Sequence, residues 1–328
     1  MVFLILALGT IIFYASWQIL EPINKRDFKT EEFYIEKGLG VKEISQKLKE
    51  RGFIRSPFWF EVYVWFNKSG SALKAGKYAL SRNINIPQMV EMFTGGKVIF
   101  NEVQLTFPEG FTLTQIKKRL LDGGVLLAET LDEKKVGDFQ IQYKFFIDTP
   151  AEASLEGFLF PDTYRFKKDL KTEEIVKKFL DNFDKKITPE LRAEISRQRK
   201  SIFEIIILAS IIQQESLNEE EMPQIAGVFV KRLQNNMPLE SDATINFITG
   251  KQDRQPLYED LKINSPYNTY LNRGLPPGPI CNPGLAAIKA AIYPQIGDYF
   301  YFLHPLDGLT IFSKTLEEHN KNKAKYLK

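Results

Sequence analysis

The sequence has little of the chemistry on which disulfides and metal sites depend. Its 328 residues include a single cysteine, Cys281, so no disulfide can form within the chain. The two histidines, His304 and His319, have no cysteine near them and lack the spacing of a zinc site. We therefore expect no bound metal.

The chain also lacks a strong charge of either sign. Its formal net charge is +3 and its isoelectric point is about 8.6. Nucleic-acid-binding domains usually carry dense clusters of lysine and arginine, so we expect no nucleic-acid partner. Hydrophobic residues make up 44% of the chain and charged residues 26%, which is typical of a globular protein of one or two domains.

One long hydrophobic run is present, at the start of the chain. Val2–Leu20 contains no charged residue, and a bilayer span needs roughly 20 residues. Trp17 suits an interfacial position, and we favour an uncleaved anchor. The alternative is a signal peptide, which would have a shorter apolar run and a small-residue cleavage site. Lys25 and Arg26 follow the run, and by the positive-inside rule they would keep the rest of the chain in the cytoplasm. Two charges are too few to decide the orientation, which we take from the soluble part of the chain.

Residues 21–150 contain an internal repeat. At constant spacing, Gly38, Val41, Ile44, Leu48 and Gly52 recur as Gly110, Leu113, Ile116, Leu120 and Gly124, and a third stripe has Ile86, Met89 and Phe93. Strand-like segments precede these helices at 32–35, Gly76–Leu80 and Glu102–Thr106, so the predicted unit is strand, loop and short helix, used three times. This unit resembles the LysM-like module, which grips glycan chains in many proteins. A purely structural role is the alternative.

The stretch 201–216 is the one around which the rest of the chain is organised. Ser201 and Glu204 have the spacing of a capping box, which predicts the start of a helix. The positions up to Ile212 are almost all apolar, and the run is too short for a bilayer, so we predict a core helix. It ends on Glu215, whose desolvated carboxyl would suit a general acid. Alternatively, Glu215 only marks where the helix reaches water.

Two other carboxylates are candidates for a cleft. Glu156 lies in the aromatic-rich stretch 155–166, which fits either a sugar-binding cleft or a buried hairpin. Asp242 precedes a short apolar stretch. A long loop rich in proline, glycine and asparagine follows at 264–283, and a loop of this length inside a compact domain is often functional.

Five blocks occur in a fixed order in the second half of the chain. They are LEGFLFPDTY, LASIIQQES, IAGVFVKRLQNNMPLESDATINFITG, SPYNTYLNRGLPPGPICNPGLAAIKAA, and YFYFLHP followed by IFSKTLEEHNK. In this order they closely resemble the endolytic murein transglycosylases, the YceG-like family. The resemblance covers essentially the whole chain, and the ordered set is specific although no single block would suffice.

The resemblance implies a fold class and a location. The fold would be α+β, with a transmembrane anchor at 1–20, a LysM-like subdomain at 21–100 and a mixed α/β catalytic domain at 101–328 built around the buried helix. Residues 101–150 would include a further LysM-like βα unit. The protein would cross the cytoplasmic (inner) membrane once, with its catalytic domain on the extracytoplasmic or periplasmic side.

The resemblance also implies an activity. Members of the family are lytic transglycosylases that cut the bond between N-acetylmuramic acid (MurNAc) and N-acetylglucosamine (GlcNAc) inside nascent peptidoglycan strands. They leave 1,6-anhydro-MurNAc ends and so influence strand length during cell-wall synthesis. The expected partners are peptidoglycan strands and the cytoplasmic membrane, with cell-wall synthases as further candidates. No cofactor is expected.

The family's catalytic glutamate lies in the motif S-I-[VI]-x-x-E, which falls on Glu215. The predicted substrate-binding residues are Asp242, Asn268, Thr269, Tyr270 and Glu156. Gln213 and Gln214 stand where some members carry Glu and Lys, which leaves Glu215 as the only carboxylate in its helical turn.

A lone carboxylate suits this reaction. The sugar's own C6 hydroxyl would be the nucleophile, and intramolecular attack has a high effective molarity. Ordinary glycoside hydrolases use two carboxylates. Two alternatives stay open: a muramidase that hydrolyses the same bond, and a membrane-tethered scaffold that only binds peptidoglycan.

Overall fold

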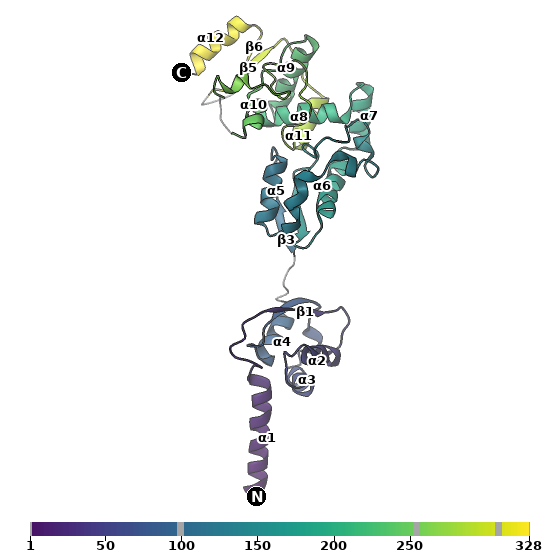
Figure 1. Ribbon diagram of the computed structural model, residues 1–328, viewed down its shortest axis with the longest axis vertical. Helices are drawn as coiled ribbons and strands as arrows, with labels where there is room; N and C mark the ends of the chain where they lie inside the picture. The colour runs from purple at the N-terminus through teal and green to yellow at the C-terminus, as the bar shows by residue number, and fades with distance from the viewer. Residues whose placement is uncertain (1, 97–101, 252–255, 306–309, 328) are drawn as a thin grey trace. The chain divides into compact units, whose positions relative to one another are not determined.

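The chain folds into two compact units, Met1–Asn101 and Glu102–Lys328, in a computed structural model of the protein (Figure 1). The structure describes residues 2–96, 102–251, 256–305 and 310–327. Both units combine helices with small antiparallel sheets, which confirms the predicted α+β class.

The first unit is built on one pair of antiparallel strands. Its elements are α1 (Val2–Leu20), β1 (Glu31–Ile35), α2 (Val41–Glu50), α3 (Pro57–Phe66), β2 (Gly76–Leu80) and α4 (Ile86–Gly95). Glu31 pairs with Leu80, and Ile35 pairs with Gly76. Alternation along β1 turns Phe33 and Ile35 inward, where they join side chains of α2, α3, α4 and β2 in one core.

The helix predicted at the start of the chain forms as α1. Its 19 residues include no charged side chain. Within the part of the chain that the structure describes, no helix has both the length and the hydropathy needed to cross a membrane. The helix is confirmed, and its role as a membrane anchor stays a prediction.

The second unit opens with a similar arrangement of strands and helices. Its first elements are β3 (Glu102–Thr106), α5 (Leu113–Asp122), β4 (Thr163–Lys167) and α6 (Thr172–Lys186). β3 and β4 pair antiparallel, with Glu102 opposite Lys167. The stretch 155–166 is therefore not a hairpin, because its strand residues pair with the distant β3. The second strand–helix pair of this unit, β4 and α6, lies outside the predicted repeat.

The backbone confirms the predicted repeat. Gly38 and Gly110 have φ angles of +93° and +79°, and Gly52 and Gly124 have φ angles of +71° and +82°. These left-handed conformations favour glycine, which explains why glycine recurs before and after both helices. The strand–helix order of the three copies is as predicted; their likeness to a glycan-gripping module stays a prediction.

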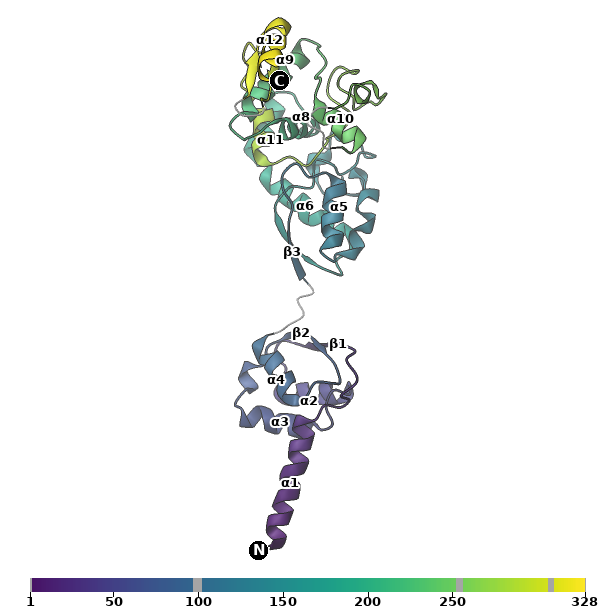
Figure 2. The same ribbon diagram turned by 90° about the vertical axis from the view of Figure 1, so that its left-hand side faces the viewer.

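The rest of the second unit surrounds one apolar helix, α8. The remaining elements are α7 (Pro189–Arg197), α8 (Ile202–Glu215), α9 (Met222–Gln234), α10 (Asp242–Thr249), α11 (Leu285–Ile292), β5 (Tyr301–Leu303), β6 (Ile311–Ser313) and α12 (Leu316–Tyr326). Short 3₁₀ helices lie at Gly70–Ala72, Leu126–Glu133, Val136–Asp138, Lys144–Phe146 and Asp260–Lys262. α8 contacts α7, α9, α10 and α11, and Figure 2 shows it inside the second unit.

Candidate active site

A cavity of about 1480 Å³ opens in the second unit. Its wall is formed by the turn before α5, the end of α8, the start of α10, residues 300–305 and α12. Glu215, the last residue of α8, lies on this wall. The cavity therefore combines segments that are far apart in the sequence around the predicted acid.

Local sequence explains why Glu215 is placed there. The Ser201 hydroxyl accepts a bond from the Glu204 amide at 3.0 Å, and the Glu204 carboxylate accepts one from the Ser201 amide at 2.8 Å. This is the predicted capping box, and it fixes the start of α8. Nine residues of the helix are buried, so the helix is held by packing on all sides. The predicted core helix is confirmed.

The Glu215 carboxyl is desolvated and bonded on one oxygen. Its Oε1 accepts a hydrogen bond from the Ser241 hydroxyl at 2.5 Å and another from the Ala243 amide, in the first turn of α10, at 3.3 Å. Burial raises the pKa of this carboxyl above its usual range, and the charge of Asp242 raises it further. The bonds from Ser241 and Ala243 oppose the rise because they favour the ionised form. The group is thus suited to both gaining and losing a proton.

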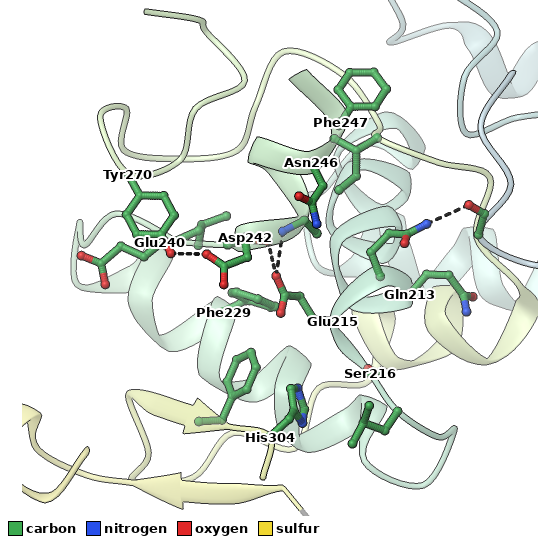
Figure 3. Close-up of a pocket in the computed structure, with 18 of the residues that line it drawn as sticks. Gln213, Glu215, Ser216, Phe229, Glu240, Asp242, Asn246, Phe247, Tyr270 and His304 are labelled. Carbon is green, nitrogen blue, oxygen red and sulfur yellow. Dashed lines mark hydrogen bonds between the residues drawn. The ribbon is translucent and has the colours of Figure 1, made fainter. Parts of the chain in front are cut away.

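Asp242 and Tyr270 lie beside Glu215 in the same cavity (Figure 3). The Tyr270 hydroxyl donates a hydrogen bond to Asp242 Oδ1 at 2.5 Å. Burial raises the pKa of Asp242, while the bond from Tyr270 and the charge of Lys323 lower it. Asp242 is therefore a second carboxyl near Glu215. The sequence predicted that Asp242 borders the cleft, but it did not show that the two carboxyls lie side by side.

Asn268 and Thr269 are not among the residues that line the cavity. Both are buried, and their side chains hold the loop that carries Tyr270. The Asn268 amide group donates to the carbonyls of Leu261 and Ile263, each at 2.9 Å, and its oxygen accepts from the Tyr270 amide at 3.0 Å. The Thr269 hydroxyl accepts from the Ser241 amide at 3.0 Å. The structure thus gives these two residues positioning contacts to the loop and to Ser241.

Glu156 borders the cavity and bonds to the first turn of α5. Its two oxygens accept from the Leu113 amide at 3.0 and 2.9 Å, and Oε1 also accepts from the Asn282 side-chain amide at 2.8 Å. Its side chain is 6% exposed, and burial raises its pKa to about 8 despite these bonds. The geometry assigns Glu156 to holding α5 and the Asn282 loop together.

Removing this carboxyl should destabilise the second unit. We expect Glu156→Ala to lower the free energy of unfolding by about 2–4 kcal/mol, since it leaves buried donors unpaired and opens a cavity. Glu156→Gln keeps an acceptor oxygen and should cost less. Urea unfolding followed by circular dichroism measures both, and equal losses would contradict this role.

The same experiment has an expected pH dependence. The folded-state pKa of Glu156 is raised from 4.5 to about 8, so the folded chain binds its proton more tightly. The resulting stability is fully present below the unfolded-state pKa and is lost as the pH rises through about 8. Glu156→Gln should flatten this part of the profile.

Two glutamines fix the end of α8. Gln213 accepts a bond from the Gly284 amide at 2.9 Å, and Gln214 donates one to the Gly110 carbonyl at 2.7 Å. A glutamate at the first position could accept the same bond, and a lysine at the second could donate it. The departure from the Glu-Lys pair of some family members therefore leaves these contacts possible.

Sequence reasoning missed Ser241 and Arg232. Ser241 is 2% exposed and gives Glu215 its shorter bond. Arg232 is 5% exposed and is inside α9. Its guanidinium donates to the carbonyls of Pro238, Leu239 and Phe300 at 3.0, 3.0 and 2.7 Å, and to the Glu240 carboxylate at 2.9 Å. Arg232 thus holds the segment that leads into Ser241. Its only sequence signal is a charge within an apolar helical stripe.

Metal ligands do not gather in the part of the chain that the structure describes. No group of three or more His, Cys, Asp or Glu side chains is arranged there to hold an ion. The expectation that the protein needs no cofactor stays a prediction.

The chain is similar to known proteins. A family model described as the YceG-like family matches residues 33–325. The chain is 33% identical to the endolytic murein transglycosylase of Bacillus subtilis (strain 168), over 98% of this chain and 91% of that protein. It is 31% identical to the endolytic murein transglycosylase of Streptococcus pneumoniae serotype 2 (strain D39 / NCTC 7466), over 94% of this chain and 60% of that protein.

A solved structure is also similar. The 2.6 Å crystal structure of a yceG-like protein from Listeria monocytogenes superposes with a TM-score of 0.62 and 34% sequence identity. The match covers 89% of this chain and 98% of the Listeria chain.

Proposed function

The chain belongs to the YceG-like family, and from this premise we propose that it is an endolytic lytic transglycosylase of peptidoglycan. Two relatives that bear the name endolytic murein transglycosylase match at least 94% of the chain. The observation that carries the proposal is the Glu215 carboxyl, which is half-buried at the cavity wall and has a raised pKa. A protonated carboxyl beside a large cleft can act as a general acid on a bound glycan.

The proposed reaction needs one acid that becomes a base. Protonated Glu215 gives its proton to the oxygen that leaves the MurNAc C1 atom as the glycosidic bond breaks. The C6 oxygen of the same sugar then bonds to C1, and its proton passes to the Glu215 carboxylate. No water is consumed, and Glu215 ends the cycle protonated. The product is a 1,6-anhydro-MurNAc end.

The partners of Glu215 support this cycle. After the proton leaves, Ser241 and Ala243 donate hydrogen bonds to the new carboxylate. The amide of Ala243 belongs to the first turn of α10, where the helix dipole favours a negative charge. The carboxylate is thus stabilised where it forms, without a metal ion.

The Ser241 bond should set the upper limit of the pH range. Activity requires protonated Glu215, so the rate should fall as pH rises through its pKa. Ser241 lowers that pKa, and Ser241→Ala should therefore move the basic limb of the rate profile to higher pH. Ser216→Ala is the matched control, because the Ser216 hydroxyl bonds to the Ile212 carbonyl instead. The pH dependence of kcat measures both, and an unmoved limb in Ser241→Ala would refute the assignment.

A hydrolytic muramidase is the second candidate, and Asp242 favours it. Two carboxyls near one another are what a glycoside hydrolase uses to handle water or a covalent intermediate. Mass spectrometry of glycan digested by the full chain separates the two reactions, because hydrolysis leaves one more water on the product than an anhydro end. Reducing MurNAc ends would reject the transglycosylase proposal and support the muramidase.

A peptidoglycan-binding scaffold is the third candidate. The strand–helix repeats of the first unit support a glycan-gripping role for it. A wild-type chain that sediments with peptidoglycan but leaves strand length unchanged would support the scaffold and reject the enzyme. We propose that binding and cleavage occur in the same chain.

We also propose that α1 anchors the chain in the cytoplasmic membrane, with the second unit outside. The charge-free sequence of α1 supports its insertion in the membrane. The second unit would then be outside because the glycan strands on which it acts lie on that side. Cell-wall synthases would then be neighbouring partners. Protease added to spheroplasts should digest the second unit while a cytoplasmic marker survives. Protection of both would reject the proposed orientation.

A further inference from the structure

The outer face of α3 is aromatic and uncovered. Phe58, Trp65 and Phe66 are 60%, 78% and 77% exposed. Their spacing of seven and eight residues places them on one side of the helix, while Phe60 and Val64 are buried on the other. A short helix that is apolar on both faces is unusual for a surface element, and its outer face calls for an apolar neighbour.

Charge on α3 itself is limited to one residue. Glu61 is the one charged residue in the sequence of α3. Its carboxylate is half-buried and accepts a hydrogen bond from the Ser45 hydroxyl of α2 at 2.6 Å. The charged residues nearest in sequence to the two ends of α3 are both basic, Arg55 and Lys68. The face thus has exposed aromatic rings near both ends of α3 and a basic residue beyond each end.

Ring contacts join this face to α1. Tyr14 and Trp17 of α1 lie with ring centroids 6.2 Å apart, Tyr14 lies 6.4 Å from Trp59 of α3, and Trp59 lies 5.1 Å from Phe58. The apolar surface therefore continues from α1 onto α3 through these ring contacts.

Arg55 connects the segment before α3 to the end of α1. Its guanidinium lies 4.5 Å from the centre of the Trp17 ring and donates to the carbonyls of Glu21 and Pro22, each at 2.6 Å. Figures 1 and 2 both show α3 on the side of the first unit from which α1 emerges. Helix α3, which carries the exposed aromatic rings, therefore lies where α1 leaves the unit.

We propose that the outer face of α3 lies in the headgroup boundary of an anionic lipid bilayer beside α1. Tryptophan and other aromatic rings are favoured at this depth, and basic flanks are attracted to anionic lipids. This inference rests on the proposed membrane location of α1. It gives the first unit a fixed orientation on the membrane surface.

The chemistry of the face favours lipid over a protein surface. A protein interface usually surrounds its apolar centre with a polar rim. Here the aromatic face continues directly into α1, whose sequence has no charged residue. A bilayer matches this arrangement: its hydrocarbon core would surround α1, and its charged headgroups would lie at the level of Arg55 and Lys68.

The three tryptophans of the chain make a direct test possible. All three, Trp17, Trp59 and Trp65, are in the first unit. The full chain with Trp17→Phe and Trp59→Phe keeps only Trp65, and the matched variant with Trp59→Phe and Trp65→Phe keeps only Trp17. Both are reconstituted in phosphatidylglycerol-containing vesicles whose lipids carry bromine either near the headgroup or near the bilayer centre.

The expected result is quenching of Trp65 fluorescence, stronger with bromine near the headgroup than near the centre. The loss should shrink in vesicles of neutral phosphatidylcholine. If Trp17 is quenched and Trp65 is not, α1 is in the membrane and the α3 proposal fails alone. If neither is quenched, the membrane location itself fails. An unquenched Trp65 in a chain that cross-links to a second copy through this face would overturn the proposal in favour of that copy.

Discussion

Glu215→Gln is expected to lower the rate of glycan-strand cleavage by about 10³-fold, because the amide can neither give nor take a proton. The amide has nearly the shape of the carboxyl, and its oxygen can still accept the bonds from Ser241 and Ala243. The variant should therefore fold and bind glycan as before, with the loss confined to kcat. Strand length after digestion, measured by chromatography of the products, reports the rate.

A matched control separates charge from chemistry. Glu220→Gln removes an exposed carboxylate just beyond the end of α8 and should leave the rate unchanged. A Glu215→Gln chain that cleaves at the normal rate would move the acid elsewhere. Asp242 would then be the first candidate, because it lies beside Glu215 in the cavity, and Glu156 the second.

Arg232→Met should give the largest loss of stability. The change keeps the apolar stem but removes a buried guanidinium that bonds to three carbonyls and to Glu240. Three carbonyls would lose their donor, and at about 1–3 kcal/mol for each unsatisfied group the free energy of unfolding should fall by about 3–5 kcal/mol. Because the segment it holds leads into Ser241, a small displacement there could lower kcat by about 100-fold. Guanidinium-chloride unfolding and strand cleavage measure the two effects.

Arg232→Lys is the conservative comparison. Lysine keeps the positive charge but lacks the planar fork that reaches several acceptors at once. We expect it to fall between the wild type and Arg232→Met in both stability and rate. If Arg232→Met were as stable and as active as the wild type, the segment before Ser241 would have to be held by other contacts.

Local sequence patterns predicted the structural elements that depend on residues close together in the chain. The capping box of Ser201 and Glu204 acts over three residues, and the glycines of the repeat are required by single φ angles. Helix α8 and the strand–helix repeats were therefore predictable before any tertiary contact was known.

The rest of the site depends on pairs that are distant in sequence. Ser241 meets Glu215 across 26 positions, and Tyr270 meets Asp242 across 28. Nothing in the sequence near Ser241 distinguishes it from an ordinary serine in a loop. The family resemblance indicated Asp242 and Tyr270 individually, but only the fold shows the bond between them.

Asn268 and Thr269 illustrate a related limit. Short polar side chains are used both to bind ligands and to satisfy the backbone of irregular loops. At these two positions the backbone contacts occupy the side chains: Asn268 bonds to the amide of Tyr270, and Thr269 to the amide of Ser241. A motif position identified from a family can therefore support a cleft from behind.

The two glycine turns of the repeat have different surroundings. At Gly38, an added Cβ would meet no atom within 4 Å among the described residues, whereas at Gly110 it would lie 3.0 Å from the Gln214 side chain. The same turn is thus a free surface in the first unit and a support for the end of α8 in the second. The second copy of the turn contacts the helix that ends at Glu215, so equivalent insertions should be tolerated in the first turn and should displace Glu215 in the second.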